Sequence, residues 1–243
     1  MSLNILIQGA LGRMGSALKQ AVEERGHTIV AEIDLGDCVE DAIAGADLAI
    51  DFSHHSATLA LAKCAGQKGI PLIIGTTGHS EEEKANITKA LEATPAVWAG
   101  NYSLGVNLLF YLTQRASEIL PNEYDVEVIE MHHRYKKDAP SGTAENLLDR
   151  VKAASQRSDH ELLHGREGII GERTDREIGV HSMRGGDVVG DHTVVFSALG
   201  ERLELTHKAS DRMIFARGAI HAGEWLVSQQ PGIYHMQDVL GLK

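Results

Sequence analysis

The segment Leu3-Asn-Ile-Leu-Ile-Gln-Gly-Ala-Leu-Gly-Arg-Met-Gly15 decides the fold of the first part of this chain. Its first half, Leu3–Gln8, is an apolar run with the composition of a buried strand. Its second half spaces three glycines as G-x-x-G-x-x-G ahead of an amphipathic stretch, Ser16–Arg25, that predicts a helix. Small residues in such a turn let the main chain approach a pyrophosphate, and the next helix directs its positive N-terminal end at it. The segment therefore predicts a strand–turn–helix unit that binds a dinucleotide.

An acidic side chain stands at the end of the next predicted strand, where a dinucleotide-binding unit makes its ribose contact. Thr28–Ile33 is followed by Asp34, with Glu32 nearby. A carboxylate at this place accepts hydrogen bonds from the adenosine ribose hydroxyls. Leu35-Gly36 follows instead of Lys or Arg, so the sequence predicts no dedicated 2′-phosphate site. We therefore expect NADH to bind at least as well as NADPH.

The first hundred residues alternate short apolar runs with amphipathic stretches, as in a parallel sheet wound with helices. The predicted strands are Leu3–Gln8, Thr28–Ile33, Leu48–Phe52, Pro71–Ile74 and Ala96–Trp98, and the predicted helices are Ser16–Arg25, Ser56–Lys68 and Ser80–Ala93. The last of these helices starts with a capping box. The pattern predicts a doubly wound, Rossmann-like α/β domain over residues 1–102.

Two more strand ends carry polar, glycine-rich turns, Gly75-Thr-Thr-Gly78 and Ala99-Gly-Asn-Tyr-Ser103. The carboxyl ends of the strands line the ligand crevice of an open α/β sheet, so we expect these turns to flank the nicotinamide half of the cofactor. A third strand end, Asp51–His55, contains two adjacent histidines. No third metal ligand of suitable spacing lies near His54 and His55, and we interpret the pair as part of a solvated loop.

The pattern changes after Tyr102, where predicted strands follow one another without helices between them. The predicted helices are Leu104–Ile119 and one from Ser141, and the predicted strands are Asp125–Met131, Glu177–Arg184, His192–Leu199 and Arg202–Lys208. The polar, glycine-interrupted stretch Ala154–Asp175 predicts a long loop. Consecutive strands favour an antiparallel or mixed sheet, so we expect a second α+β domain over residues 103–210.

Residues 211–243 form the last predicted segment. Ser210-Asp211 is expected to cap a helix that runs to about Val227. Its apolar residues, among them Ile214, Ala219 and Trp225, need a partner surface, and we expect the helix to return to the dinucleotide-binding domain.

Composition excludes several classes of partner. The chain has 243 residues, 43% of them apolar, and a formal net charge of −11. An acidic surface argues against nucleic acid or an anionic membrane, because both require a basic face. The two cysteines, Cys38 and Cys64, form no Cys-x-x-Cys pair, and we expect both to be buried in a protein of a reducing compartment. No apolar stretch reaches the length of a membrane span, so we predict a cytoplasmic protein.

The run Glu130–Ala144 concentrates positive charge and titratable side chains in this acidic chain. It contains adjacent imidazoles and three cations, namely His132, His133, Arg134, Lys136 and Lys137. Imidazoles exchange protons near neutral pH, and a local group of cations attracts a small anion. Adjacent residues of a strand point to opposite sides and the cations repel a divalent ion, so we expect no metal here. The run predicts an anion site equipped for proton transfer.

The turn Pro140-Ser-Gly-Thr143 extends this predicted site. Ser141 or Thr143 can cap the following helix, and Gly142 admits a ligand close to the main chain. The free N–H groups at the start of that helix can bind a carboxylate. A small carboxylate substrate is therefore the expected ligand.

These motifs resemble, in order along nearly the whole chain, those of the 4-hydroxy-tetrahydrodipicolinate reductase (dihydrodipicolinate reductase) family. The matching segments are Gly9–Gly15, Gly75–Gly78, Asn101–Asn107, His132–Ala144, Gly185–Gly190, Thr206–Ala209 and Gly232–Leu242. Members of this family are nicotinamide-dependent enzymes of the diaminopimelate route to lysine. The resemblance implies a dinucleotide domain and a substrate domain whose sheets assemble a homotetramer.

The resemblance also implies roles for individual residues. It makes His132 the general acid and Lys136 a second acid that interacts with the substrate. The expected substrate-binding residues are His133, Ser141, Gly142 and Thr143. The expected cofactor-binding residues are Gly9, Ala10, Leu11, Gly12, Arg13, Met14, Asp34, Gly75, Thr76, Thr77, Ala99, Gly100, Asn101 and Tyr102. His221 lies where relatives have a basic residue near the cofactor, which leaves open how the adenosine end is held.

We therefore expect an NAD(P)H-dependent oxidoreductase that reduces 4-hydroxy-tetrahydrodipicolinate to tetrahydrodipicolinate. Hinges near Tyr102 and Ser210 would close the crevice, hydride would add to C4 of the ring, and His132 would protonate C3. Two alternatives remain at this point. One is another two-domain nicotinamide-dependent reductase of a small dicarboxylate, and the other is a non-enzymatic redox sensor that binds NADH.

Overall fold

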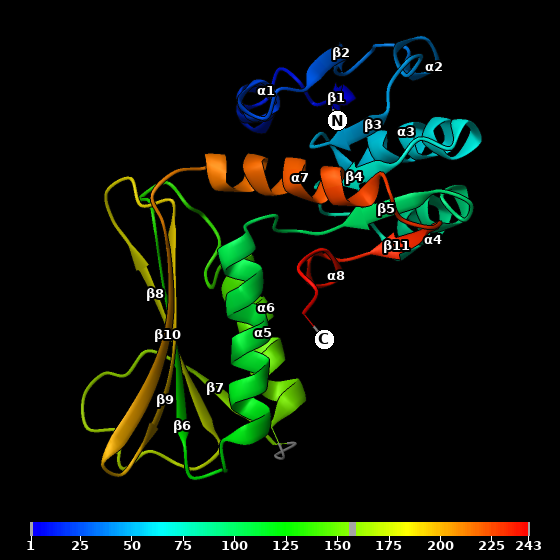
Figure 1. The fold of residues 1–243 in the computed structure, drawn as a ribbon. Helices are drawn as coiled ribbons and strands as arrows, with labels where there is room; N and C mark the ends of the chain where they lie inside the picture. Colours follow the sequence, from blue (N-terminus) through cyan, green and yellow to red (C-terminus); the bar gives the residue numbers. More distant parts are fainter. Residues whose placement is uncertain (1, 156–158, 243) are drawn as a thin grey trace. The chain divides into compact units, whose positions relative to one another are not determined.

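The computed structural model describes residues 2–155 and 159–242, and the chain divides into two compact units (Figure 1). The first unit comprises Met1–Leu104 and Arg212–Lys243, and the second comprises Gly105–Asp211. The C-terminal segment is therefore part of the first unit, and the two boundaries lie one or two residues from those expected. Within the described residues, no helix has both the length and the apolar character needed to cross a membrane.

The first unit is built on a six-stranded sheet in the order β11-β5-β4-β3-β1-β2, in which every neighbouring pair is parallel. Its strands are β1 (Asn4–Gln8), β2 (Thr28–Ile33), β3 (Leu48–Asp51), β4 (Leu72–Ile74), β5 (Pro95–Trp98) and β11 (Gly232–Tyr234). Its helices are α1 (Arg13–Glu24), α2 (Val39–Ala42), α3 (His55–Lys68), α4 (Glu81–Ala90), α7 (Met213–Leu226) and α8 (Met236–Val239). The predicted doubly wound parallel sheet is confirmed.

Two hydrophobic cores cover the two faces of this sheet, because successive side chains of a strand point to opposite faces. Ile5 and Ile7 of β1 join residues of α1, α7 and α8 in one core, whereas Leu6 joins residues of α3 and α4 in the other. All three side chains are fully buried, which explains why the strand is apolar throughout rather than alternating. The parallel arrangement also brings the carboxyl ends of the strands to one edge of the sheet.

The second unit is built on a five-stranded mixed sheet in the order β10-β9-β6-β8-β7. Its strands are β6 (Asp125–His132), β7 (Glu161–His164), β8 (Glu177–Arg184), β9 (Gly190–Ala198) and β10 (Glu201–Ala209), and its helices are α5 (Leu104–Ile119) and α6 (Gly142–Ala154). β6 pairs antiparallel with β9 and parallel with β8. Both helices share one core with the sheet, including Val106, Val128 and Leu147. The predicted α+β domain with a mixed sheet is confirmed.

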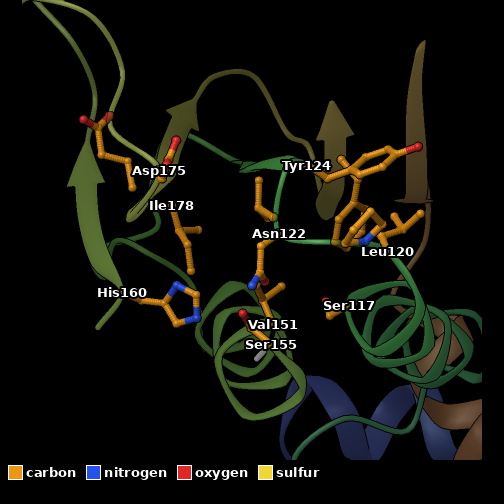
Figure 2. Close-up of a pocket in the computed structure, with 13 residues that line it drawn as sticks. Ser117, Leu120, Asn122, Tyr124, Val151, Ser155, His160, Asp175 and Ile178 are labelled. Atoms are coloured by element: carbon orange, nitrogen blue, oxygen red, sulfur yellow. The ribbon is translucent and has the colours of Figure 1, made fainter. Parts of the chain in front are cut away.

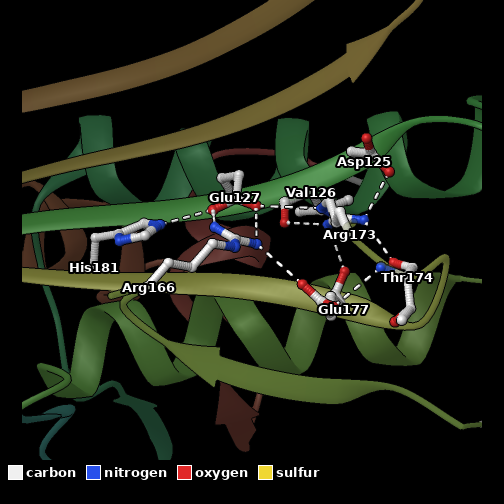
Figure 3. Close-up of polar contacts among 8 residues, drawn as sticks. All are labelled: Asp125, Val126, Glu127, Arg166, Arg173, Thr174, Glu177 and His181. Atoms are coloured by element: carbon white, nitrogen blue, oxygen red, sulfur yellow. Dashed lines mark hydrogen bonds and ion pairs between the residues drawn. The ribbon is translucent and has the colours of Figure 1, made fainter. Parts of the chain in front are cut away.

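Glu127 of β6 is the centre of a charged cluster on the face of the sheet opposite Val128 (Figure 3). Arg166 donates to both of its carboxylate oxygens at 3.0 and 2.9 Å, and His181 Nε2 lies 2.7 Å from Oε2. Burial raises the pKa of Glu127, but the hydrogen bonds from Arg166 and His181 outweigh burial and lower that pKa to about 2. Arg173 adds a contact to the main-chain oxygen of Glu177 at 2.6 Å. The cluster therefore holds the segment that precedes β8 against strand β6.

Two predictions of secondary structure are wrong, one for a loop and one for the start of a helix. The predicted loop Ala154–Asp175 contains β7, which pairs parallel with β8; residues 156–158 of that prediction lie outside the described residues. A four-residue strand whose side chains are half-buried or exposed has too little apolar alternation to be found without its neighbour. Helix α7 begins at Met213, with Arg212 rather than Ser210-Asp211 at its cap position. The helix starts where its side chains enter the core, because Met213 is already buried.

The two cysteines differ in environment. Cys64 is buried as predicted, but Cys38 is exposed, so the prediction of two buried cysteines is wrong for Cys38. Cys38 lies in the polar connection before α2, and its thiol contacts the Glu40 carboxylate at 3.4 Å. Both side chains are free thiols.

Candidate functional site

The glycine-rich turn after β1 combines packing constraints with an opening at its centre. Gly9 has φ +84°, and a Cβ there would lie 2.3 Å from the main-chain oxygen of Phe52. A Cβ at Gly15 would lie 2.4 Å from the main-chain oxygen of Gly9. A Cβ at Gly12 would meet only that same oxygen at 3.4 Å. The fold therefore requires the first and third glycines, whereas the second keeps space open beside the main chain.

Helix α1 directs its N-terminal end at this opening. The helix begins at Arg13, three residues before the predicted start, so the last part of the glycine motif is its first turn. Gly12 is the N-cap residue of α1, and no side-chain hydrogen bond caps this end of the helix in the described part of the chain. The N–H groups of Arg13 and Met14 can therefore donate to a bound phosphate. Such an end binds phosphate oxygens through its N–H groups and its dipole.

Asp34 lies directly beside the same turn. Its Oδ2 accepts a hydrogen bond from Leu11 N at 3.0 Å, and its Oδ1 accepts one from Leu35 N at 2.9 Å. These two bonds lower the pKa of Asp34, so the carboxylate is ionised at neutral pH. The side chain is half-buried and lines a cavity that a ligand can enter. The structure thus joins the second strand end to the glycine turn, as a ribose contact requires.

A cavity of about 670 Å³ lies at this edge of the first unit. Its lining includes Gly9, Gly12, Asp34, Asp37 and His54. The volume suits the adenosine half of a dinucleotide, and Gly12 is the point at which a side chain would narrow it. None of the described residues that line the cavity is Lys or Arg. The residues present therefore fit a nicotinamide dinucleotide, and two of them, Asp34 and Asp37, are acidic.

The carboxylate of Asp51, whose role was not predicted from the sequence, links three strand ends through hydrogen bonds. Asp51, fully buried at the end of β3, accepts from Gln8 Nε2 at 3.1 Å and from Thr58 Oγ1 at 2.6 Å. Ser53 donates its hydroxyl to Asp51 Oδ1 at 2.5 Å, and Ser53 N donates to Thr76 Oγ1 at 2.9 Å. The turns after β1, β3 and β4 are thereby fixed relative to one another.

The two other predicted cofactor turns lie side by side. A Cβ at Gly100 would be 3.6 Å from Thr77 Cγ2, and a Cβ at Gly75 would be 2.3 Å from the Phe52 ring. The Tyr102 side chain is fully buried, and its hydroxyl donates toward the main-chain oxygens of Ile74 and Val97 at 2.9 Å. Tyr102 therefore supports these turns from the core, and its ring is not available to a ligand.

The prediction of a solvated loop for the His54-His55 pair holds for His54, which is exposed outside the helix, and is wrong for His55, which is the first residue of α3. His54 is the cap residue of α3 and accepts from Ser56 N, while His55 Nδ1 lies 2.8 Å from Glu83 Oε1. In the part of the chain that the structure describes, no group of three His, Cys, Asp or Glu side chains is arranged to hold a metal ion. The pair instead fixes the start of α3 against α4.

The second candidate site lies at the end of β6, around the predicted acid His132. His132 is 8% exposed, and its Nδ1 lies 2.6 Å from Glu130 Oε2. Arg184, at the end of β8, donates to both oxygens of Glu130 at 2.7 and 2.8 Å. His192 of β9 packs its ring edge-on against His132 with 5.1 Å between centroids. The sequence predicts His132 but not its three partners Glu130, Arg184 and His192.

The titration of these groups is set by burial and by the neighbouring charges. Burial lowers the pKa of His132, while the hydrogen bond and charge of Glu130 oppose that change. Burial raises the pKa of Glu130, but the hydrogen bonds from Arg184 and His132 outweigh it and leave this pKa lowered. Burial lowers the pKa of His192 to about 4, so that ring is neutral at neutral pH. The arrangement can hold a proton on His132 and release it readily.

The start of α6 forms the other wall of this site, as predicted from the Ser-Gly-Thr turn. Ser141 Oγ accepts from Ala144 N at 3.2 Å and lies 3.0 Å from His192 Nε2. Ser141 N donates to Glu130 Oε1 at 3.2 Å. Gly142 is exposed, and a Cβ there would meet no heavy atom within 4 Å. The first turn of α6 is therefore capped, held by Glu130 and open to an anion at Gly142.

Lys136 and His133 lie in the turn that connects β6 to this helix. Lys136 Nζ is 2.8 Å from Asp138 Oδ2, and Arg184 donates to the main-chain oxygen of Asp138 at 2.7 Å. His133 N donates to the main-chain oxygen of Val188 at 2.7 Å, in the connection between β8 and β9. Both predicted residues thus lie next to His132, in a turn that hydrogen bonds from Arg184 and to Val188 hold in place.

The second unit also contains a small cavity of about 40 Å³ between α5, α6 and the sheet (Figure 2). Its lining includes Ser117 of α5, Val151 of α6 and Ile178 of β8. The cavity has room for only a few water molecules, so a cyclic dicarboxylate does not fit. It is therefore not a candidate for the substrate site.

Comparison with known proteins identifies relatives over the whole length of the chain. The dihydrodipicolinate reductase N-terminal family matches residues 3–102, and the dihydrodipicolinate reductase C-terminal family matches residues 105–240. A protein of Akkermansia muciniphila named 4-hydroxy-tetrahydrodipicolinate reductase is 52% identical over 242 residues, covering 99% of this chain and 98% of its own. A protein of the same name from Thiobacillus denitrificans is 43% identical over 267 residues and covers 100% of both chains.

Solved structures show the same fold. Dipicolinate-bound dihydrodipicolinate reductase from Paenisporosarcina sp. TG-14 superposes with a TM-score of 0.81 at 24% identity, covering 98% of this chain and 99% of its own. The DAP dehydrogenase of C. glutamicum superposes with a TM-score of 0.55 at 10% identity, covering 97% and 93%. The latter likeness concerns the architecture alone.

Proposed function

The chain belongs to the dihydrodipicolinate reductase family, and from this premise we propose that it reduces 4-hydroxy-tetrahydrodipicolinate to tetrahydrodipicolinate at the end of β6. As a member it is a nicotinamide-dependent oxidoreductase of the diaminopimelate route to lysine. One observation supports the assignment of the site residues. His132 is buried beside the first turn of α6, and its Nδ1 is hydrogen-bonded to the Glu130 carboxylate. This geometry combines a proton donor with a carboxylate-binding turn.

The reaction needs one hydride and one proton, and the described side chains account for the proton. When bound, a reduced nicotinamide cofactor supplies the hydride to C4 of the ring, after the 4-hydroxyl has left as water. His132 then donates its Nε2 proton to C3, where the electron pair of the ring double bond is released, and it becomes neutral with Nδ1–H still bonded to Glu130. Its lowered pKa makes the proton more acidic, which favours transfer to carbon.

The remaining residues of the site bind and orient the dicarboxylate. Gly142 and Thr143 present the start of α6 to one substrate carboxylate, with Ser141 as the cap that fixes this turn. Lys136 and His133 supply the other polar contacts, and Lys136 stabilises negative charge at the ring nitrogen or a carboxylate. The dipicolinate bound to the relative of known structure is a planar dicarboxylate of this class.

The cofactor end supports NADH at least as strongly as NADPH. Residues Gly9–Met14 hold the pyrophosphate, Asp34 binds the ribose hydroxyls, and the turns Gly75–Thr77 and Ala99–Tyr102 flank the nicotinamide. Asp34 is ionised, and Asp37 lines the same cavity, so a 2′-phosphate would meet negative charge. Of the residues that line this cavity, His54 is the one whose side chain can carry a positive charge.

The assembly and location are part of the same proposal. We place the protein in the cytoplasm as a homotetramer, supported by its free thiols and by a sheet face that bears Ile129, Met183 and Val195 opposite α5 and α6. Sedimentation of the purified protein at several concentrations tests the tetramer. A monomer at micromolar concentration contradicts it.

Turnover and coupled binding test the function together. Purified protein should oxidise NADH only when freshly prepared 4-hydroxy-tetrahydrodipicolinate is present, with one NADH consumed per product. Pyridine-2,6-dicarboxylate, a planar mimic of the substrate, should compete with it and should bind more tightly in the presence of NADH. NADH consumption independent of substrate, or no consumption at all, would overturn the proposal.

A further inference from the structure

Glu130 makes more contacts than a structural ion pair requires. Its side chain is 0% exposed, and its two oxygens receive hydrogen bonds from His132, from both terminal nitrogens of Arg184 and from Ser141 N. Replacing a buried ion pair by apolar residues of similar volume often leaves stability unchanged or improves it, so stability alone does not explain this carboxylate. Its partners are instead the predicted acid and the predicted carboxylate-binding turn.

We propose that Glu130 is the positioning residue of the reaction, with Arg184 as the cation that keeps it ionised and in place. The inference rests on the proposed function, since it assigns to Glu130 the task of preparing His132 for proton donation. Glu130 sets the orientation of the imidazole and, through Ser141 N, the position of the turn that binds the substrate carboxylate. One buried side chain thereby fixes acid and substrate relative to each other.

The first part of this role is the choice of the nitrogen that donates. Because Nδ1 is bonded to a carboxylate, it keeps its proton after transfer, and Nε2 is the atom that gives one up. Nε2 lies against Gly190 of β9, where a Cβ would be only 2.9 Å away. The main chain thus approaches Nε2 without a side chain to cover it. Glu130 therefore orients the ring with Nδ1 toward the carboxylate and Nε2 toward Gly190.

The second part of the role is electrostatic. The groups that face His132 are Glu130 on its own strand, Lys136 in the following turn, Arg184 on β8 and His192 on β9. Burial, Lys136 and Arg184 all disfavour the protonated ring, and His192 is itself neutral. Glu130 is the group in this set that favours protonation. Loss of its charge would lower the pKa of His132 further and leave still less of the ring protonated near pH 7.

The variant Glu130→Gln tests both parts, because it keeps the size of the side chain and removes its charge. The amide can donate to Nδ1, which fixes His132 in a neutral form without a proton to spare. We expect kcat to fall about 10- to 100-fold at pH 7.5 and the basic limb of the pH profile to move to lower pH by about one unit, with the Kd for NADH unchanged. A nitrogen-15 NMR titration of the histidines, with His132 assigned from its absence in His132→Gln, should show the same displacement without any turnover. Glu130→Asp should restore part of the displacement.

Glu127→Gln is the matched control. Glu127 lies on the same strand and is also paired with arginine, but on the opposite face, so its removal should leave the His132 titration in place. If Glu130→Gln does not fold because Arg184 is left unpaired, Glu130→Gln/Arg184→Gln removes both charges and should show a smaller displacement in the same direction, because Arg184 disfavours the protonated ring. An unmoved His132 titration in either folded variant would overturn the inference. Full activity in His132→Gln would instead overturn the proposed acid, which separates the two failures.

Discussion

Replacing Gly142 by Val tests whether the first turn of α6 binds the substrate carboxylate. The fold should tolerate the change, because a Cβ at Gly142 meets no heavy atom within 4 Å and its φ is not in the left-handed region. Loss of glycine reduces the freedom of the unfolded chain by about 0.4–1 kcal/mol, and the lower helix propensity of a β-branched residue offsets part of this gain. The free energy of unfolding should therefore change by no more than about 1 kcal/mol.

The expected loss of binding follows from the donors at this helix end. Ser141 N donates to Glu130, Ala144 N to Ser141 Oγ, and Glu145 N to the main-chain oxygen of Ser141. The Gly142 N–H is thus one donor that this turn can offer to an incoming carboxylate. A hydrogen bond to a charged group contributes roughly 1.5–3 kcal/mol, so blocking it should weaken pyridine-2,6-dicarboxylate binding about 10- to 150-fold.

Calorimetric titration with NADH and then with pyridine-2,6-dicarboxylate measures both ligands on one sample. NADH affinity should be unchanged, because its predicted contacts belong to the first unit. Asn146→Val, on the exposed side of the same helix, is the matched control and should bind both ligands as wild type does. Dicarboxylate affinity within threefold of wild type in folded Gly142→Val would show that the turn only caps a helix.

Three further substitutions address the acid, the cofactor contact and the charged cluster. His132→Gln should lower kcat by about 10²–10⁴ with little change in NADH affinity, and turnover within a few-fold of wild type would contradict the assignment. Asp34→Ala should weaken NADH more than NADPH in paired binding titrations, and an unchanged ratio would remove Asp34 from the ribose contact. Glu127→Gln should destabilise the second unit by roughly 3 kcal/mol near neutral pH, at about 1.4 kcal/mol per pKa unit. Because the folded pKa is depressed to about 2, this difference from wild type should be complete above pH 4.5 and shrink as the pH falls toward 2. Equal denaturation midpoints at pH 6 would show that the cluster adds no stability.

The spacing of apolar residues predicts most of the helices and strands, because elements that bury a large face have the clearest apolar pattern. α5 and β8 have the bounds Leu104–Ile119 and Glu177–Arg184, as predicted, and each presents an apolar face to one core. β7, β11 and α2 are short, at four, three and four residues, and were not predicted. Such segments are ordered by their neighbours: β11 exists because β5 offers it an edge. Local sequence contains no signal for that pairing.

The candidate site was predictable where its residues are adjacent in sequence and not where they meet through the sheet. His132, Lys136 and Gly142 lie within one run, and a resemblance to a known family gave them roles. Glu130 carried a usable signal, since it stands two residues before His132 and must point to the same side of the strand. Arg184 reaches Glu130 only because β6 and β8 pair with His132 opposite Arg184. That register is a property of the folded sheet.

Each unit fixes its candidate site with one fully buried carboxylate at a strand end, but the two differ in their partners. Asp51 is held by the neutral groups of Gln8, Ser53 and Thr58, so its hydrogen bonds orient loops, and the imidazole whose pKa its charge raises is His79, which has no part in the proposed proton transfer. Glu130 is held by Arg184 and by a titratable imidazole, so its charge acts on the proton that the reaction uses. Neutralising Asp51 should therefore disturb binding at the first unit without moving the limb of the pH–rate profile that His132 sets, whereas neutralising Glu130 should move that limb. The difference follows from the partners, since a carboxylate can tune only a group that shares its proton or its field.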